Sequence, residues 1–200
     1  MNVQVGKPAP EFEAEAYRRG SLEAARLSLK DYRGRWVVLF FYMRDFTLIC
    51  QTEICAYADL EGQFQKEAAE IVAASTDSFS SHKAWFESNP RLGMVNYPVL
   101  ADTSHQASEA YGVLLPAGTA QRATFIIDPE GAVRYVDVTE LNVGRNARET
   151  LRVLQALKTG EPCPAGWRPG QPTLSAEALA IEELQRERVR VVSAEGQSGH

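Results

Sequence analysis

Short apolar runs alternate along this chain with segments of helical periodicity. Residues 36–42 read Trp-Val-Val-Leu-Phe-Phe-Tyr, and residues 122–128 read Arg-Ala-Thr-Phe-Ile-Ile-Asp. A continuous run of apolar, β-branched and aromatic residues is typical of a strand that is buried on both faces. Residues 71–75 and 97–100 predict two shorter strands. After the Asp-Pro-Glu-Gly turn that starts at Asp128, residues 133–139 are expected to return as the second strand of a hairpin.

Helices are predicted between these strands, over residues 50–67, 80–88, 104–111 and 145–158. Gly112 and Gly160 end the last two. This alternation predicts a three-layer α/β domain with a mixed central sheet flanked by helices. We expect it to occupy residues 1–160. From Glu161 onward the composition shifts to Pro and Gly, so residues 161–200 are expected to form an extended C-terminal tail, with one more helix over 176–190.

Composition narrows the class of protein. The chain has 200 residues, 44% of them hydrophobic and 24% charged, and a net charge of −5. These values fit one globular domain and argue against nucleic-acid binding, which needs a basic face. The first residues lack the pattern of a signal peptide, and the longest apolar run, 36–43, is too short to span a bilayer. We therefore expect a cytoplasmic protein without a membrane partner.

The candidate chemistry centres on Cys50, which lies where a buried strand leads through a polar loop into a helix. Unpaired N–H groups and the helix dipole favour a thiolate in the first turn. The hydroxyl of Thr47, three residues earlier, can reach the sulfur or a bound oxygen. An arginine brought across the sheet would stabilise charge on a leaving oxygen. These are the requirements for attack on an O–O bond, although a lone cysteine in an apolar stretch is more often a small buried hydrophobic residue.

Several motifs occur together in one order and resemble those of the peroxiredoxins. The similarity is to the typical two-cysteine subgroup, which includes the peroxidase component of alkyl hydroperoxide reductase, and it covers roughly residues 3–175. The motifs are Lys7-Pro-Ala-Pro-Glu-Phe12, Thr47-x-x-Cys50 with Glu53, Ser75-Thr-Asp77, His82-Lys-Ala-Trp85, Arg122-Ala-Thr-Phe, and Glu161-Pro-Cys-Pro-Ala-Gly-Trp167. Like the pattern of elements, this resemblance implies a thioredoxin-like fold. It further implies a thiol peroxidase that reduces hydrogen peroxide and organic hydroperoxides.

The resemblance also implies a role for five residues. Cys50 would be the peroxidatic nucleophile, and Thr47 would hydrogen-bond the thiolate and the peroxide. Arg122 would hold the thiolate and polarise the substrate, and Glu53 would orient an arginine or close the pocket. Cys163 would be the resolving thiol, supplied by a second subunit.

Two positions depart from the family pattern. Met43 stands where the family has a proline that shields the substrate pocket, and it places an oxidisable thioether close to peroxide. Gln51 stands where the subgroup usually has a proline after the nucleophile. The second change is the milder one, because glutamine restores a backbone N–H at the helix start.

Cys55 offers an alternative resolving thiol, since another peroxiredoxin subgroup has its resolving cysteine at this spacing. In an intact helix, five residues advance by about 500°, so the two side chains would point about 140° apart with a rise of about 7.5 Å. A disulfide needs Cα atoms within about 7 Å, so a Cys50–Cys55 bond would require the helix to unwind. The other interpretation is that Cys55 is a buried residue on the helix face.

The family implies no metal or organic cofactor. It implies a homodimer, which often assembles into rings of five dimers, and an electron donor that is thioredoxin or a flavin-dependent disulfide reductase. A peroxide sensor or holdase with little turnover needs the same reactive thiol and stays open as an alternative. Steady-state turnover with a reductase separates the sensor from the enzyme.

Overall fold

The computed structural model describes residues 3–174, 179–181 and 183. It divides the chain into two compact units, residues 1–151 and 152–200. The predicted helix over 176–190 lies largely outside the described residues. Within them, no helix has the length and apolar character needed to cross a membrane.

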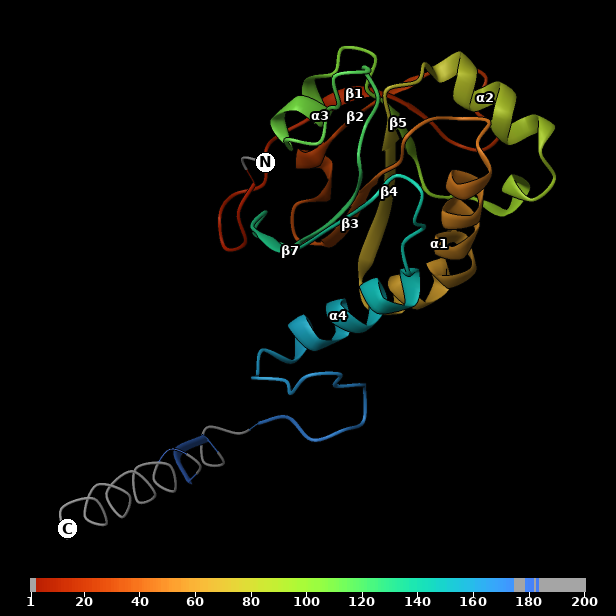
Figure 1. The fold of residues 1–200 in the computed structure, drawn as a ribbon. Helices are drawn as coiled ribbons and strands as arrows, with labels where there is room; N and C mark the ends of the chain where they lie inside the picture. Colours follow the sequence, from red (N-terminus) through yellow and green to blue (C-terminus); the bar gives the residue numbers. More distant parts are fainter. Residues whose placement is uncertain (1–2, 175–178, 182, 184–200) are drawn as a thin grey trace, which may run out of the picture. The chain divides into compact units, whose positions relative to one another are not determined.

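A mixed sheet of seven strands forms the centre of the first unit (Figure 1). Its order is β2-β1-β5-β4-β3-β6-β7, with β3 parallel to β4 and antiparallel to β6. The strands are β1 (Glu13–Tyr17), β2 (Ala25–Ser28), β3 (Trp36–Phe41), β4 (Ala69–Ser75), β5 (Val99–Ala101), β6 (Arg122–Ile127) and β7 (Val133–Thr139). The mixed sheet and the β6–β7 hairpin were both expected from the sequence.

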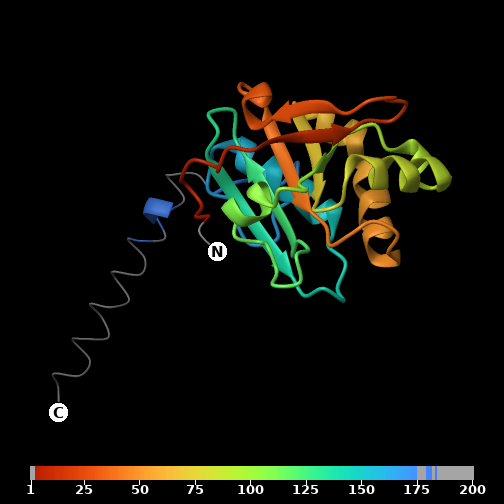
Figure 2. The ribbon, with the colours of Figure 1, turned by 90° about the horizontal axis from the view of Figure 1, so that it is seen from above.

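Helices cover both faces of the sheet (Figures 1 and 2). The α-helices are α1 (Leu48–Lys66), α2 (Phe79–Ser88), α3 (Gln106–Ala110) and α4 (Ala147–Thr159), and short 3-10 turns span Leu29–Tyr32 and Leu92–Met94. Each α-helix falls within a few residues of a predicted one. The strand β3 is continuously apolar because both of its faces are covered.

Alternate residues of β3 define the two layers. Val37, Leu39 and Phe41 belong to a cluster that also contains Ala107 of α3 and residues from the N-terminal segment. On the other face, Phe40 stacks on Tyr57 of α1, with ring centroids 4.3 Å apart. The face that carries α1 is the one that positions the candidate site.

The hairpin of β1 and β2 was not predicted. Its strands are short and partly exposed, and the pair Arg26–Glu13 at 2.8 Å joins them on the surface. Charged residues alternate with alanine in β1, so the apolar signal that marked the buried strands is weak there. The pairing becomes favourable only once β5 supplies the other neighbour of β1.

The second unit contains most of α4 and the segment that follows it. Trp167 is buried, its indole N–H donates to the Gln171 carbonyl at 3.0 Å, and its own carbonyl accepts from Arg152 at 2.9 Å. The Leu174 N–H donates to the Pro162 carbonyl at 2.8 Å. These bonds close a compact loop around Cys163.

Candidate active site

The first turn of α1 places Cys50 at the positive end of the helix. Thr47 is the N-cap, with an extended backbone at φ −116° and ψ 143°, and the Gln51 N–H donates to its carbonyl at 3.1 Å. The N–H groups that precede Gln51 in the helix have no intrahelical acceptor, as at every helix start. The first turn contains no acidic residue. A fully buried Cys50 therefore faces a local field that favours a negative sulfur.

Arg122 reaches this sulfur from the neighbouring strand. It begins β6, which pairs with the end of β3 through Ala123 and Phe41. Its Nη1 lies 3.2 Å from the Cys50 Sγ, while its Nε donates to the Leu141 carbonyl at 2.8 Å. Only 1% of the Arg122 residue surface is exposed. The arginine predicted to come across the sheet is therefore in contact with the cysteine.

Glu53 lies three residues after Cys50 and joins two arginines. Its Oε2 accepts from Arg122 Nη1 at 2.6 Å. Its Oε1 accepts from both the backbone N–H and the Nε of Arg145, at 2.9 and 2.8 Å. Glu53 thus contacts both Arg122 and Arg145.

Among the buried side chains around Cys50, the positive charges outnumber the negative ones. Arg122 and Arg145 carry two positive charges because guanidinium groups stay protonated in proteins, and Glu53 contributes one negative charge. All three side chains are at most 1% exposed. The Cys50 sulfur therefore lies in contact with a guanidinium, Arg122, that shares its carboxylate with a second guanidinium.

Arg145 was not identified from the sequence. Its Nη1 donates to the Ala123 carbonyl at 2.7 Å, and its guanidinium lies 5.4 Å from the centre of the Phe40 ring. Its partner Glu53 lies 92 residues away along the chain, so no local signal in the sequence identified it.

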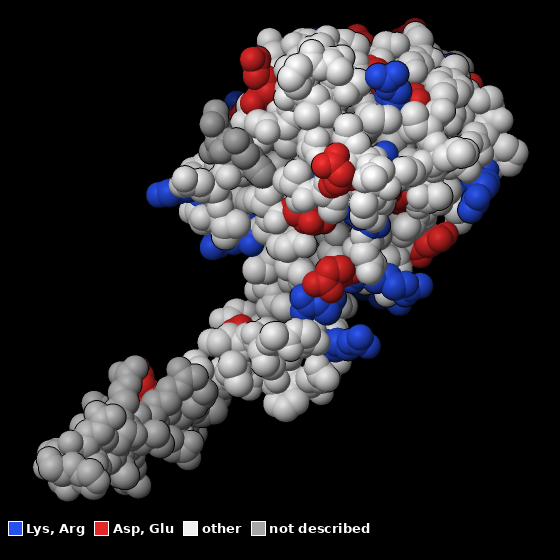
Figure 3. All heavy atoms as spheres, viewed as in Figure 1, with Lys and Arg blue, Asp and Glu red and all other residues white. Residues whose placement is uncertain are grey.

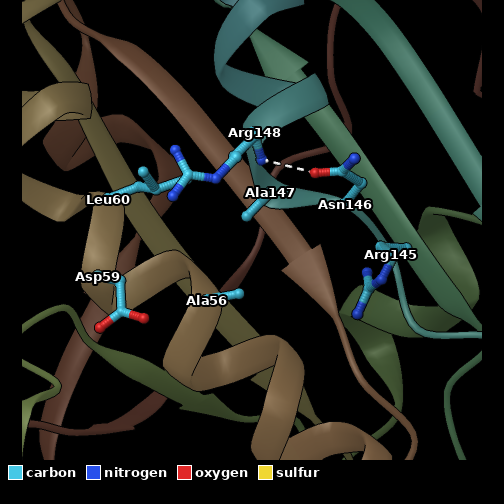
Figure 4. A pocket seen from close by; sticks show the side chains of 7 residues that line it. All are labelled: Ala56, Asp59, Leu60, Arg145, Asn146, Ala147 and Arg148. Carbon is cyan, nitrogen blue, oxygen red and sulfur yellow. Dashed lines mark hydrogen bonds between the residues drawn. The ribbon is translucent and has the colours of Figure 1, made fainter.

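A small cavity of about 260 Å³ opens beside this network (Figure 4). It is lined by Ala56, Asp59, Leu60, Arg145, Asn146, Ala147 and Arg148. The Asn146 side chain accepts from the Arg148 N–H at 3.0 Å, which caps the start of α4. This cap fixes the backbone next to Arg145, and so supports the position of Glu53.

Thr47 and Met43 lie on the loop between β3 and α1. The Thr47 hydroxyl donates to the Arg44 carbonyl at 3.0 Å, and not to the Cys50 sulfur. Its oxygen lone pairs can still accept a hydrogen bond from a peroxide. Met43 is half-buried, two residues after the end of β3.

Cys55 is buried on α1, one turn beyond the nucleophile. Its Sγ lies 3.5 Å from the Arg91 carbonyl. Burial raises the pKa of the Cys55 thiol above its ordinary value. Both features fit a residue that packs the helix face.

Cys163 belongs to the second unit and lies just beyond the end of α4. It is half-buried and reduced, at a hollow of about 550 Å³. Its sulfur lies 3.5 Å from the Thr159 hydroxyl and 3.8 Å from the Ala156 carbonyl. Cys50 thus lies at the start of one helix, and Cys163 among oxygen atoms at the end of another.

Metal binding finds no support in the part of the chain that the structure describes, where no three His, Cys, Asp or Glu side chains form a group that could hold an ion.

On the face seen in Figure 3, acidic and basic side chains are interspersed, and neither kind covers a broad area.

Comparison with known proteins gives consistent matches. The AhpC/TSA family matches residues 5–136, and the C-terminal domain of 1-Cys peroxiredoxin matches residues 156–186. A putative peroxiredoxin of Bacillus subtilis, YkuU, is 48% identical over 176 residues, covering 85% of this chain and 97% of the relative. Peroxiredoxin prdx-2 of Caenorhabditis elegans is 49% identical over 188 residues, covering 90% and 92%. The crystal structure of reduced Plasmodium vivax 2-Cys peroxiredoxin has a TM-score of 0.79 at 33% identity, covering 84% of this chain and 91% of that one. The fold is thus the expected thioredoxin-like one.

Proposed function

Since this chain belongs to the AhpC/TSA family of peroxiredoxins, which are thiol peroxidases, we propose that Cys50 is the residue that attacks the peroxide. The contact between Arg122 Nη1 and Cys50 Sγ, at 3.2 Å, carries this proposal. Of the three cysteines, Cys50 has both a helix N-terminus and a guanidinium directed at its sulfur. Cys55 and Cys163 instead lie against backbone carbonyl groups.

The first step is a displacement on oxygen. The Cys50 thiolate attacks the terminal oxygen of a hydroperoxide, an S–O bond forms as the O–O bond breaks, and one proton completes the departing water or alcohol. The products are a Cys50 sulfenic acid and that water or alcohol. Arg122 faces the negative charge as it moves from sulfur to the leaving oxygen. Thr47 accepts a hydrogen bond from the peroxide, which aligns the O–O bond with the sulfur.

Burial of Cys50 restricts the way in which substrate reaches it. The whole residue is inaccessible to solvent. We propose that the peroxide enters beside the loop of residues 43–49, which leads into α1. Met43 is the half-buried side chain on this loop that replaces the family proline. We assign it to the substrate pocket, where a longer and flexible thioether takes the place of a compact, rigid proline ring.

In the second step, the Cys163 thiol of another copy of the chain condenses with the sulfenic acid. The disulfide forms as the S–OH bond breaks and water leaves. Support comes from the position of Cys163, which is half-exposed at the hollow beside the end of α4, and from the likeness of the chain to the 2-Cys peroxiredoxin of Plasmodium vivax. The buried Cys50 has to leave its helical turn to meet a partner thiol, so local unwinding of α1 precedes this step.

Resolution within one chain through Cys55 is less well supported. Cys55 lies on the same helix as Cys50, its sulfur faces the Arg91 carbonyl, and its thiol pKa is raised by burial. A bond between the two would require a large part of α1 to unwind.

The disulfide is then reduced by an external dithiol protein. Thioredoxin or a flavin-dependent disulfide reductase supplies the two electrons by thiol–disulfide exchange. The working form in this scheme is at least a homodimer, because the two cysteines of each disulfide come from different copies. A ring of five dimers is compatible with the scheme.

Intact-mass analysis without reductant, after one equivalent of peroxide, tests this pairing. A species with the mass of two chains, whose cross-linked peptide contains Cys50 and Cys163, is expected. A single chain that has lost two hydrogens and contains a Cys50–Cys55 peptide would overturn resolution by Cys163.

A further inference from the structure

A second buried polar network surrounds Asp45, on the loop that joins β3 to α1 and precedes Thr47 and Cys50. The Asp45 carboxylate accepts hydrogen bonds from the Tyr42 hydroxyl and the Ser81 hydroxyl, each at 2.7 Å, and His82 Nδ1 lies 2.9 Å from one of its oxygens. The Asp45 N–H donates to an Asp77 carboxylate oxygen at 2.9 Å. The Asp45 side chain is only 1% exposed. We call Tyr42, Asp45, Ser75, Asp77, Ser81 and His82 the Asp45 cluster.

This cluster ties the loop to the rigid part of the fold. Tyr42 directly follows β3, while Ser81 and His82 belong to α2. Asp77 accepts from the Ser75 hydroxyl, at the end of β4, at 2.7 Å. His82 Nε2 lies 3.3 Å from the Leu100 carbonyl of β5. A single loop carboxylate is thereby connected to three neighbouring strands and a helix.

Within this cluster, the Tyr42 hydroxyl has a fixed acceptor in Asp45. Burial and the neighbouring Asp45 carboxylate raise the pKa of Tyr42 well above its ordinary value, so its hydroxyl stays protonated and donates. A buried carboxylate with several donors is costly to disrupt, because each lost partner leaves a polar atom without water. The loop is therefore held at Asp45 with little freedom.

The next residue holds an unfavourable backbone conformation. Phe46 has φ +57°, in the left-handed region that a residue with a Cβ adopts at a cost. Its ring centroid lies 5.8 Å from that of Trp85, and the residue as a whole is 63% exposed, so burial contributes little to holding it. Thr47 follows as the N-cap of α1, and Cys50 lies within the next turn. The strained residue therefore lies between the anchor and the reacting groups.

We infer that Asp45 is a positioning residue for the peroxidase reaction. Through the Asp45 cluster it fixes residues 45–47, so that Thr47 and Cys50 face the incoming peroxide, and it holds Phe46 in its left-handed conformation. The inference rests on the function proposed above. The hydrogen bonds of Asp45, which we call the anchor, favour the closed turn, in which the first turn of α1 is folded and Cys50 is buried. The strain at Phe46 favours opening, the unwinding of that turn, once the sulfenic acid has formed.

This balance decides the fate of the sulfenic acid. Opening of the turn lets the Cys163 thiol form the disulfide and release water. In the closed turn, a second hydroperoxide transfers an oxygen to the sulfur, giving a sulfinic acid and water or an alcohol. Weakening the hydrogen bonds of Asp45 should slow the first step and raise the share of the sulfenic acid that becomes disulfide. Relieving the backbone strain at Phe46 should lower that share.

Substitution Asp45→Asn removes the charge and keeps the shape. In the full chain, the rate of the first reaction with hydrogen peroxide should fall about tenfold or more, because the reacting groups are misplaced. The peroxide concentration that converts half of Cys50 to sulfinic acid, measured by intact mass during turnover, should rise. Ser81→Ala, which removes one neutral donor, should give the same directions more weakly and serves if Asp45→Asn does not fold.

The strain is tested by comparing Phe46→Gly with Phe46→Ala. Both variants lack the ring, and only glycine adopts a positive φ without cost. Phe46→Gly should reach half sulfinic acid at a lower peroxide concentration than Phe46→Ala.

The positioning role is overturned if a folded Asp45→Asn protein keeps both the first-step rate and the sulfinic midpoint of the unmodified chain, with peroxide consumption still lost in Cys50→Ser. Peroxide consumption that persists in Cys50→Ser would instead defeat the proposed function itself.

Discussion

Glu53 accepts two hydrogen bonds from Arg145 on the same carboxylate oxygen, one from its backbone N–H and one from its Nε. The other oxygen accepts from Arg122, whose Nη1 is also the atom in contact with the Cys50 sulfur. The loop before α4 is therefore connected to the reacting sulfur through one carboxylate and one guanidinium. Replacement of any of these residues should change both stability and reactivity.

Replacing Arg145 with alanine should destabilise the protein by about 3 kcal/mol, because it removes one partner of a buried ion pair and leaves Glu53 underpaired. Urea denaturation followed by circular dichroism measures the change. Arg148→Ala is the matched control, since Arg148 is an exposed arginine three residues away, and its loss should cost less than about 0.5 kcal/mol. Equal effects of the two substitutions would contradict the role given to Arg145.

Substituting Arg122 by alanine should slow the first step by a factor of about 100–1,000, which corresponds to about 3 kcal/mol for one preorganised donor. The rate of Arg122→Lys should fall between those of the alanine variant and the unmodified protein. Lysine keeps the charge and loses the planar guanidinium, in which Nη1 contacts Cys50 and Glu53 while Nε donates to Leu141. Stopped-flow measurement of peroxide consumption in a single turnover gives these rates. An alanine variant as fast as the unmodified protein would remove Arg122 from the chemistry.

Cys163→Ser should leave the first turnover unchanged and abolish recycling by a thioredoxin-type donor. The sulfenic acid then forms without a thiol to condense with, and dimedone should trap it at Cys50. Cys55→Ser is the matched control and should cycle normally. If the Cys163 variant cycles at the normal rate and the Cys55 variant does not, resolution occurs within one chain.

Alkylation should distinguish Cys55 from the other cysteines. Burial raises the pKa of its thiol, so at a given pH the folded protein contains less Cys55 thiolate than the unfolded chain does. Iodoacetamide at pH 8 should therefore modify Cys55 slowly in the folded state and readily in denaturant, as read by peptide mass spectrometry. Rapid modification in the folded protein would show that the thiol is accessible and reactive.

The central strands and the helices after them were predictable, because buried strands such as β3 have long apolar runs and the helix that contains Cys50 follows a clear polar loop. Arg145 was not predictable in the same way, since its partner Glu53 is 92 residues away and only the tertiary fold brings them together. The Asp45 cluster is a similar case. Its motif Ser75-Thr-Asp77 was visible, but the contact with Asp45 depends on how β4 and α2 pack beside the loop.

The role of Cys50 is tested most directly by single-turnover peroxide consumption in three variants that each lack one cysteine. Cys50→Ser should consume none, whereas Cys55→Ser and Cys163→Ser should each consume one equivalent at the rate of the unmodified protein. The sulfenic acid should be trapped on Cys50 in Cys163→Ser, and should go on to the Cys50–Cys163 disulfide in Cys55→Ser. Consumption of peroxide by the Cys50→Ser protein, at a rate near that of the other two, would show that the sulfur beside Arg122 is not the nucleophile.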